Sequence, residues 1–222
     1  MAESLNADFD KRVVVNTRAM DWQASPSPTV WRKRLDLVDG EFSRVSSVVR
    51  YDAGSSFHPH DHPEGEEILV LDGVFSDEHG NYPAGSYLLN PPGFRHTPFS
   101  RDGCVLFVKL YQYGGAKRPH VAIDTRTARW QAGDYPGAEV LPLYAQRGFS
   151  ESMKLLRLVP GTVVPLHDHP HGEEIFVLDG EFEDEHGRYP AGTWIRQPPG
   201  SAHAPVSRDG CTLYVKRDHL RA

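Results

Sequence analysis

The sequence has 222 residues, with 24 lysines and arginines against 30 aspartates and glutamates, and a formal net charge of −6. This length can bury one or two hydrophobic cores, and the composition argues against disordered or collagen-like chains. No stretch gathers basic residues into a stripe, so we expect no nucleic acid as a partner. No apolar run approaches the roughly 18 residues of a membrane span, and the N-terminus lacks the apolar segment of a secretory signal. We therefore expect a soluble, cytoplasmic protein with no membrane partner.

An internal repeat sets the expected domain organisation. At an offset of 107, residues 54–109 align without gaps on residues 161–216, and 35 of the 56 aligned positions are identical. Each repeat is about the size of a domain rather than of a solenoid unit. The sequence predicts the following division: an N-terminal extension (1–12), a first domain (13–112), a linker (113–119) and a second domain (120–222).

Within each repeat the local pattern predicts β-structure. In chain order, the first repeat has short runs rich in β-branched or aromatic residues at 46–51, 67–71 and 104–110. Turn-forming residues separate these runs, and no segment keeps a helical period for three turns. The predicted fold class is therefore all-β, with each repeat forming a sandwich or barrel.

Cys104 and Cys211 occupy matching positions on the last predicted strand of each repeat. Two cysteines this far apart can supply neither a disulfide framework nor a paired-cysteine zinc site. Each lies on the apolar face of an alternating strand, so we predict inert core residues, with redox sensors near a metal site as the alternative.

Histidine is abundant, with 12 residues, and several lie in tight clusters. In the first repeat His60 and His62 are two residues apart, which on a strand places both imidazoles on one face about 7 Å apart. Glu66 follows at an even spacing, and His96 can reach the same face from another strand. Three imidazoles and one carboxylate suit a divalent transition metal with open coordination positions.

The second repeat contains the same four residue types at the same spacing, although several neighbouring residues differ. His58 and His171 each occur in one repeat only, and we expect them to line the mouths of their cavities. We predict one metal ion per repeat, with zinc expected first and Fe(II), Mn or Ni as alternatives. The predicted ligands are His60, His62, Glu66, His96, His167, His169, Glu173 and His203.

These residues carry a family resemblance. Residues 54–73 resemble the first cupin motif, G-x5-H-x-H-x3-E-x6-G, and residues 85–96 resemble the second, G-x5-P-x-G-x2-H. Both motifs recur at 161–180 and 192–203, and only the terminal Asn of the second motif is replaced, by Ser100 and Ser207. The chain thus resembles a bicupin, which implies two jelly-roll barrels with a metal in each cavity, and most resembles the cupin domain of ChrR anti-sigma factors.

The resemblance implies two functions. In the first, the protein is a regulator that senses oxidative stress or a small ligand in the barrel cavity, with a sigma factor as the implied partner. Residues 1–45 contain neither histidine nor cysteine, so we expect the helical zinc domain that binds the sigma factor to be absent. In the second, the protein is a metal-dependent dioxygenase that cleaves a diketone-like or aromatic ketone substrate, although no residue beyond the ligands is identified as catalytic. A homodimer is expected in either case.

Overall fold

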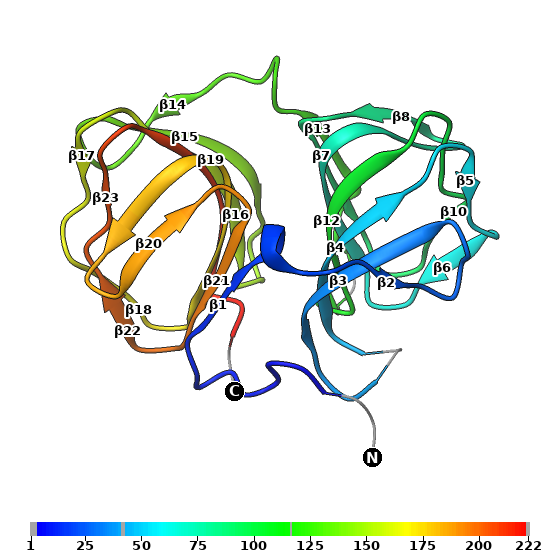
Figure 1. Ribbon diagram of the computed structural model, residues 1–222, viewed down its shortest axis with the longest axis horizontal. Helices are drawn as coiled ribbons and strands as arrows, with labels where there is room; N and C mark the ends of the chain where they lie inside the picture. Colours follow the sequence, from blue (N-terminus) through cyan, green and yellow to red (C-terminus); the bar gives the residue numbers. More distant parts are fainter. Residues whose placement is uncertain (1–3, 41–42, 116, 221–222) are drawn as a thin grey trace. The chain divides into compact units, whose positions relative to one another are not determined.

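The computed structural model describes residues 4–40, 43–115 and 117–220 of the chain. These residues form strands and turns with a single 3-10 turn, η1 (Thr17–Ala19), and they contain no α-helix. The predicted all-β fold is therefore confirmed. The chain divides into two compact units, Met1–Ala7 with Met20–Ala128, and Asp8–Ala19 with Arg129–Ala222. In each unit the strands curl into a barrel around a hydrophobic core (Figure 1).

The first unit contains one large antiparallel sheet in the order β13-β9-β7-β12-β4-β3-β2, with β8, β11 and β5 attached to it, and a small sheet of β6 and β10. The long strand β7 turns the chain from one side of the barrel to the other. The strands of this unit are β2 (Gln23–Ala24), β3 (Val30–Leu37), β4 (Val45–Tyr51), β5 (Ser55–Ser56), β6 (His60–His62), β7 (Glu66–Asp77), β8 (Gly80–Pro83), β9 (Ser86–Asn90), β10 (Phe94–His96), β11 (Phe99–Ser100), β12 (Cys104–Leu110) and β13 (Val121–Asp124).

The second unit repeats this topology, with the order β1-β21-β19-β24-β16-β15-β14 in its large sheet and a small sheet of β18 and β22. The close correspondence follows from the sequence repeat. Its strands are β1 (Val13–Asn16), β14 (Gln131–Ala132), β15 (Ala138–Ala145), β16 (Ser152–Leu158), β17 (Thr162–Val163), β18 (His167–His169), β19 (Glu173–Asp184), β20 (Gly187–Pro190), β21 (Thr193–Gln197), β22 (Ser201–His203), β23 (Val206–Ser207) and β24 (Cys211–Arg217).

The unit boundaries differ from the predicted domain boundaries because the two repeats exchange their first strands. β1, from the start of the first repeat, pairs with β21 of the second unit, and β13, from the start of the second repeat, pairs with β9 of the first unit. The predicted linker also packs in the first unit, where the Tyr113 hydroxyl donates a hydrogen bond to Glu67. An edge strand joins whichever sheet offers a free edge, and its own sequence does not specify which one.

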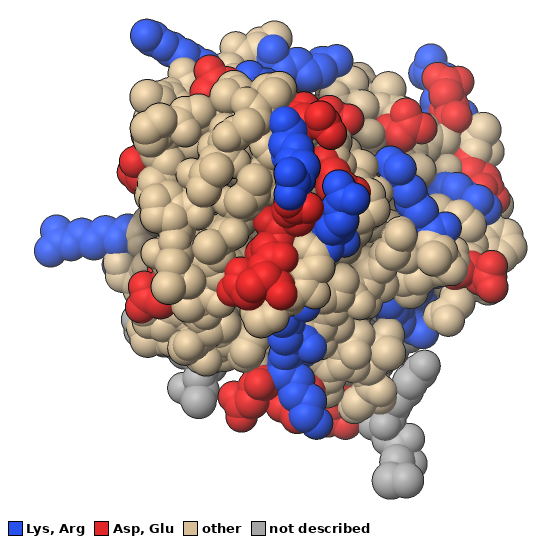
Figure 2. All heavy atoms as spheres, turned by 60° about the vertical axis from the view of Figure 1, so that its left-hand side comes forward, with Lys and Arg blue, Asp and Glu red and all other residues tan. Residues whose placement is uncertain are grey.

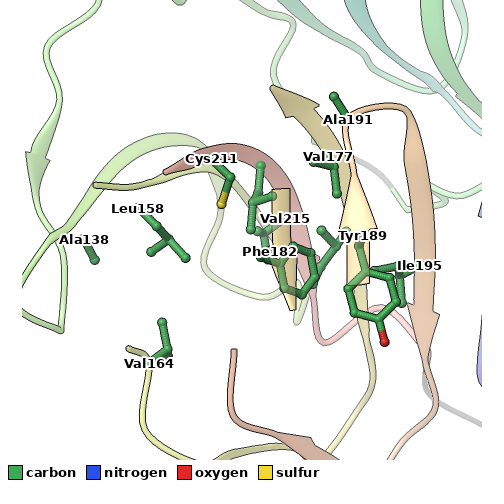
Figure 3. Packing of buried hydrophobic residues seen from close by; sticks show 12 residues of the cluster. Ala138, Leu158, Val164, Val177, Phe182, Tyr189, Ala191, Ile195, Cys211 and Val215 are labelled. Atoms are coloured by element: carbon green, nitrogen blue, oxygen red, sulfur yellow. The ribbon is translucent and has the colours of Figure 1, made fainter. Parts of the chain in front are cut away.

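Both cysteines lie in the barrel cores. Cys211 packs in a cluster with Leu158, Phe182 and Val215 (Figure 3), and Cys104 lies in the matching cluster of the first unit. Both are buried free thiols. The packing agrees with inert core residues rather than with exposed redox sensors.

We expect both thiols to resist alkylation in the folded protein. Burial raises the pKa of Cys104 to about 11 and also raises the pKa of Cys211. At pH 8 only about a thousandth of the Cys104 thiols are then thiolate, the reactive form, and this fraction grows as the pH rises towards the pKa. Intact-mass analysis after iodoacetamide treatment should find unmodified native protein and two adducts after unfolding in urea. Rapid modification of the native protein would contradict the core assignment.

Charged side chains of both signs lie on the surface of the second unit. On the face drawn in Figure 2, acidic and basic side chains are interspersed rather than gathered by sign. The second unit has several ion pairs, including Arg188 with Glu181 and Arg208 with Glu183. Among the described residues, no helix is long and apolar enough to cross a membrane.

Candidate metal centres

The first histidine cluster is built by a short strand pair. β6 and β10 run antiparallel with His60 opposite His96. Because side chains alternate along a strand, His60 and His62 share the face that His96 also meets. Glu66 opens β7, four residues after His62. The tight link between β6 and β7 thus brings side chains from three strands to one point in the barrel.

The distances in this cluster suit a single cation. The ligand atoms of His60, His62 and His96 all lie within 4.8 Å of one another. The Nε2 atoms of His62 and His96 are 3.0 Å apart. Glu66 does not belong to this group of three mutually close ligand atoms. Its Oε2 nevertheless lies 3.4 Å from His62 Nε2 and 3.5 Å from His96 Nε2. Three imidazoles therefore form the centre, with the Glu66 carboxylate against two of them.

Hydrogen bonds behind the cluster orient the imidazoles. His60 Nδ1 donates to the His58 carbonyl at 2.9 Å, which leaves Nε2 of His60 as the nitrogen that can coordinate a metal. His96 Nδ1 donates to Asp77 Oδ2 at 3.2 Å, and the Asn90 amide donates to Glu66 Oε2 at 2.9 Å. A carboxylate or carbonyl behind a histidine is the usual arrangement at protein metal sites, because it fixes the ring and leaves the other nitrogen to coordinate.

The second cluster is more complete. His167, His169, Glu173 and His203 offer ligand atoms that all lie within 4.8 Å of one another. His203 Nδ1 donates to Asp184 Oδ2 at 3.1 Å, and His167 Nδ1 donates to the Pro165 carbonyl at 2.9 Å, as in the first unit.

The second cluster contains buried polar atoms that have no hydrogen-bond partner among the described residues and that a cation could bind. Both ring nitrogens of His169 and Oε1 of Glu173 are buried without a hydrogen-bond partner in the described part of the chain. Such atoms are costly unless something satisfies them. A divalent cation would satisfy Nε2 of His169 and Oε1 of Glu173, which lie 3.4 Å apart, and the donor set of imidazole and carboxylate matches its chemistry.

Electrostatics favour cation binding here as well. Burial opposes protonation of His203, but the hydrogen bond to Asp184 and the nearby Glu173 carboxylate outweigh it and raise the pKa to about 9. Burial lowers the pKa of His169 to about 4. Burial alone would raise the pKa of Glu173, yet the nearby His203 and the charge of Arg217 bring it well below its usual range. An anionic Glu173 would pair with a divalent cation, and binding of that cation at His203 would displace the proton that the raised pKa of His203 favours.

The cavities beside the two clusters differ in size. The cavity of the first unit measures about 420 Å³ and is lined by His60, His62 and Glu66 together with mostly apolar side chains such as Phe57 and Leu106. The cavity of the second unit measures only about 40 Å³. Larger polar side chains replace small or apolar ones in the second unit.

Two replacements account for much of this difference. Arg217 stands where the first repeat has Leu110, and Lys154 stands where it has Ser47. Both Arg217 and Lys154 line the small cavity. The guanidinium of Arg217 lies directly beside the second cluster, since its Nε donates to Glu173 Oε2 at 2.7 Å. The first cavity has Leu110 in its wall instead and stays open.

The structure thus brings together the four predicted residues of the second unit, and three of those in the first with Glu66 beside them. His58 lines the first cavity as expected, whereas His171 is not among the residues that line the second. Sequence reasoning missed Asp77 and Asp184, although both belong to the repeated block D-E-H-G, which was a signal for them.

Arg12 was also missed, because it lies in the stretch predicted as an N-terminal extension. Its Nε donates to Gln197 Oε1 at 3.0 Å, and its Nη2 lies 3.8 Å from Asp184 Oδ2. The exchanged segment therefore supports the residue behind His203. No local sequence pattern predicts this contact, because the two segments are far apart in the chain.

The comparison with known families agrees with this geometry. The profile of the ChrR cupin-like domain matches residues 10–114 and again residues 118–221, which together cover nearly the whole chain. The chain belongs to the ChrR cupin-like domain family. Two copies of this cupin domain stand in tandem, so the predicted bicupin is confirmed. No curated protein gives a significant sequence match.

Solved structures share the cupin fold at low sequence identity. A protein of Nostoc punctiforme described as a candidate dioxygenase has a TM-score of 0.79 and 17% identity, over 96% of this chain and 85% of that one. Escherichia coli Ylba has a TM-score of 0.76 and 15% identity, over 97% and 94%. An oxalate decarboxylase variant of Bacillus subtilis has a TM-score of 0.63 and 10% identity, over 94% and 78%. At these identities the likeness concerns the fold alone.

Proposed function

We propose that the first cupin unit is a metal-dependent enzyme site that binds a small, largely apolar organic molecule through an oxygen-bearing end and oxidises it with molecular oxygen. The observation that carries this proposal is the cavity of about 420 Å³ with His60, His62 and Glu66 in its wall. A cavity of this size, apolar with a few convergent polar groups, is typical of small-molecule sites. The substrate class we favour is a diketone-like compound.

Each residue of the first unit has a defined part in this proposal. His60, His62 and His96 would hold a divalent metal, with Glu66 as fourth ligand. Such a metal would act as a Lewis acid and, if it is iron or manganese, would also provide redox chemistry. Asp77 and the His58 carbonyl keep the rings of His96 and His60 oriented. The apolar wall keeps water from the substrate body, which strengthens electrostatic contacts at the polar end.

Two of the structural neighbours are described as a candidate dioxygenase and an oxalate decarboxylase. These descriptions agree with an enzyme that acts on a small oxygen-bearing molecule, although the support is that of a shared fold. In this proposal the second unit contributes a metal centre whose cavity is too small for such a substrate, at about 40 Å³.

A regulatory role is the second candidate, and the match to the ChrR cupin-like domain favours it. In that case a zinc ion in each unit would be redox-inert, and occupation of the first cavity by a small molecule would be the signal. A sigma factor is the partner that the family suggests. The two candidates use the same cavity and differ in the metal and in the fate of the molecule that binds.

Metal identity and oxygen consumption separate the two candidates. Protein purified anaerobically, without chelators or a histidine tag, should contain about two metal equivalents per chain by elemental mass spectrometry. Iron or manganese, with oxygen consumption in the presence of 2,4-pentanedione that is lost in the H60A/H62A variant, would support the enzyme. Two zinc ions and no oxygen consumption after iron reconstitution would overturn the enzyme in favour of the sensor. The complete absence of bound metal would contradict both candidates.

A further inference from the structure

Two basic and two acidic side chains line the small cavity of the second unit. Arg217 and Lys154 both line it. The charge of Arg217 is matched by Glu173, whose Oε2 lies 2.7 Å from its Nε. The ammonium of Lys154 has no hydrogen bond or ion pair within the described part of the chain. Asp134, on the same wall, is exposed to solvent.

A half-buried lysine in this position is costly unless an anion joins it. Burial lowers the pKa of Lys154 and the charge of Arg217 lowers it further, although the charges of Glu173 and Asp134 act in the opposite direction. A divalent cation at His167, His169, Glu173 and His203 would add still more positive charge to the same cavity. With that ion bound, the positive charge around the cavity would exceed the negative charge of Glu173 and Asp134, and a negatively charged ligand would balance it.

We propose that the second unit binds a small carboxylate in its cavity, held between Lys154 and Arg217. Arginine presents a planar fork that matches the two oxygens of a carboxylate, and lysine supplies a compact point charge. The first unit has Ser47 and Leu110 at these positions, so the two units of one chain would take ligands of different classes. This anion site does not depend on the reaction proposed for the first unit.

The volume of the cavity limits the size of the anion. A water molecule needs roughly 10–15 Å³ of such space, so about 40 Å³ holds about three waters. Formate has three heavy atoms and fits this space. Benzoate, with nine heavy atoms, does not fit. Apolar side chains such as Leu156 and Phe182 close the remaining walls, and these would not favour a larger polar ligand.

The test uses formate as the probe on the zinc-loaded full chain. The H60A/H62A background removes two metal ligands of the first unit, so formate can no longer bind to a zinc ion in that unit. Calorimetric titration in this background should give one equivalent of bound formate. Replacement of Lys154 by serine, the residue of the first repeat, should weaken formate binding about tenfold or more, as expected for loss of a charged hydrogen bond. Benzoate should not compete with formate.

Two further variants keep the result interpretable. K11S removes an exposed lysine, whose side chain is 76% accessible, and should leave formate affinity unchanged. K154R keeps the charge and should retain formate binding, which would exclude a general folding defect in K154S as long as both variants hold one zinc. Equal formate affinity with and without Lys154 would overturn the proposal. No binding of formate to the H60A/H62A background, or competition by benzoate, would overturn it as well.

Discussion

The double substitution H60A/H62A should halve the bound metal and leave the second unit loaded. The ligands of the first centre come from β6, β7 and β10, and those of the second come from β18, β19 and β22, so each centre is built within one unit. Loss of two imidazoles from a three-imidazole centre leaves too few donors to hold an ion against water. Elemental mass spectrometry should fall from about two equivalents to about one.

A matched control tests whether coordination is responsible. His58 lies beside the cluster, but it supports His60 through its backbone carbonyl. H58A retains that carbonyl and should keep both metal ions. The mirror variant H167A/H169A should also lose about one equivalent, this time from the second unit. Unchanged metal content in H60A/H62A, or loss of both ions, would contradict two independent centres.

The metal centres were predictable because their signal is local and occurs twice. His60, His62 and Glu66 lie within seven residues of one another, and period-two alternation on strands fixes the face they share. His96 comes from farther along the chain, yet the same spacing in the second repeat identified it. The all-β fold was equally readable, since turn residues separate short β-branched runs throughout each repeat.

The exchange of β1 and β13 was not predictable from the same information. Val13–Asn16 and Val121–Asp124 begin equivalent repeats, and each pairs with the edge of the other repeat's sheet. The choice between the two sheets depends on side chains distant in sequence. One example is Arg12, which donates to Gln197. Long-range contacts of this kind leave no periodic trace in the sequence.

The difference in size between the two cavities was only partly predictable from the sequence. The strongest block of identity ends at Lys109 and Lys216, one position before Leu110 and Arg217. The change from an apolar residue to a charged one is visible in the sequence. Its effect is not, because that effect depends on the guanidinium turning inward to reach Glu173.

This replacement leads to the second large expected effect. The substitution L110R should close the first cavity and abolish its binding of 2,4-pentanedione while both metal ions remain bound. Leu110 lines that cavity together with Glu66, so an arginine there can pair with Glu66 as Arg217 pairs with Glu173. The arginine side chain would then occupy the space beside the metal centre. The affinity for 2,4-pentanedione should fall about 100-fold or more, because a charged side chain would fill the cavity. Calorimetric titration of the anaerobic metal-loaded protein measures it.

Two further variants serve as a conservative control and as the reciprocal substitution. L110M keeps an apolar side chain of similar volume and should retain most of the affinity. K154S/R217L gives the second unit the residues of the first and should open its cavity, so that it gains 2,4-pentanedione and loses formate. Binding of 2,4-pentanedione to L110R with the affinity of the original protein would show that the large cavity is not the site. Because both units share one fold and one ligand pattern, a swap of these two positions tests whether the side chains around the centre, rather than the centre itself, select the molecule that each unit binds.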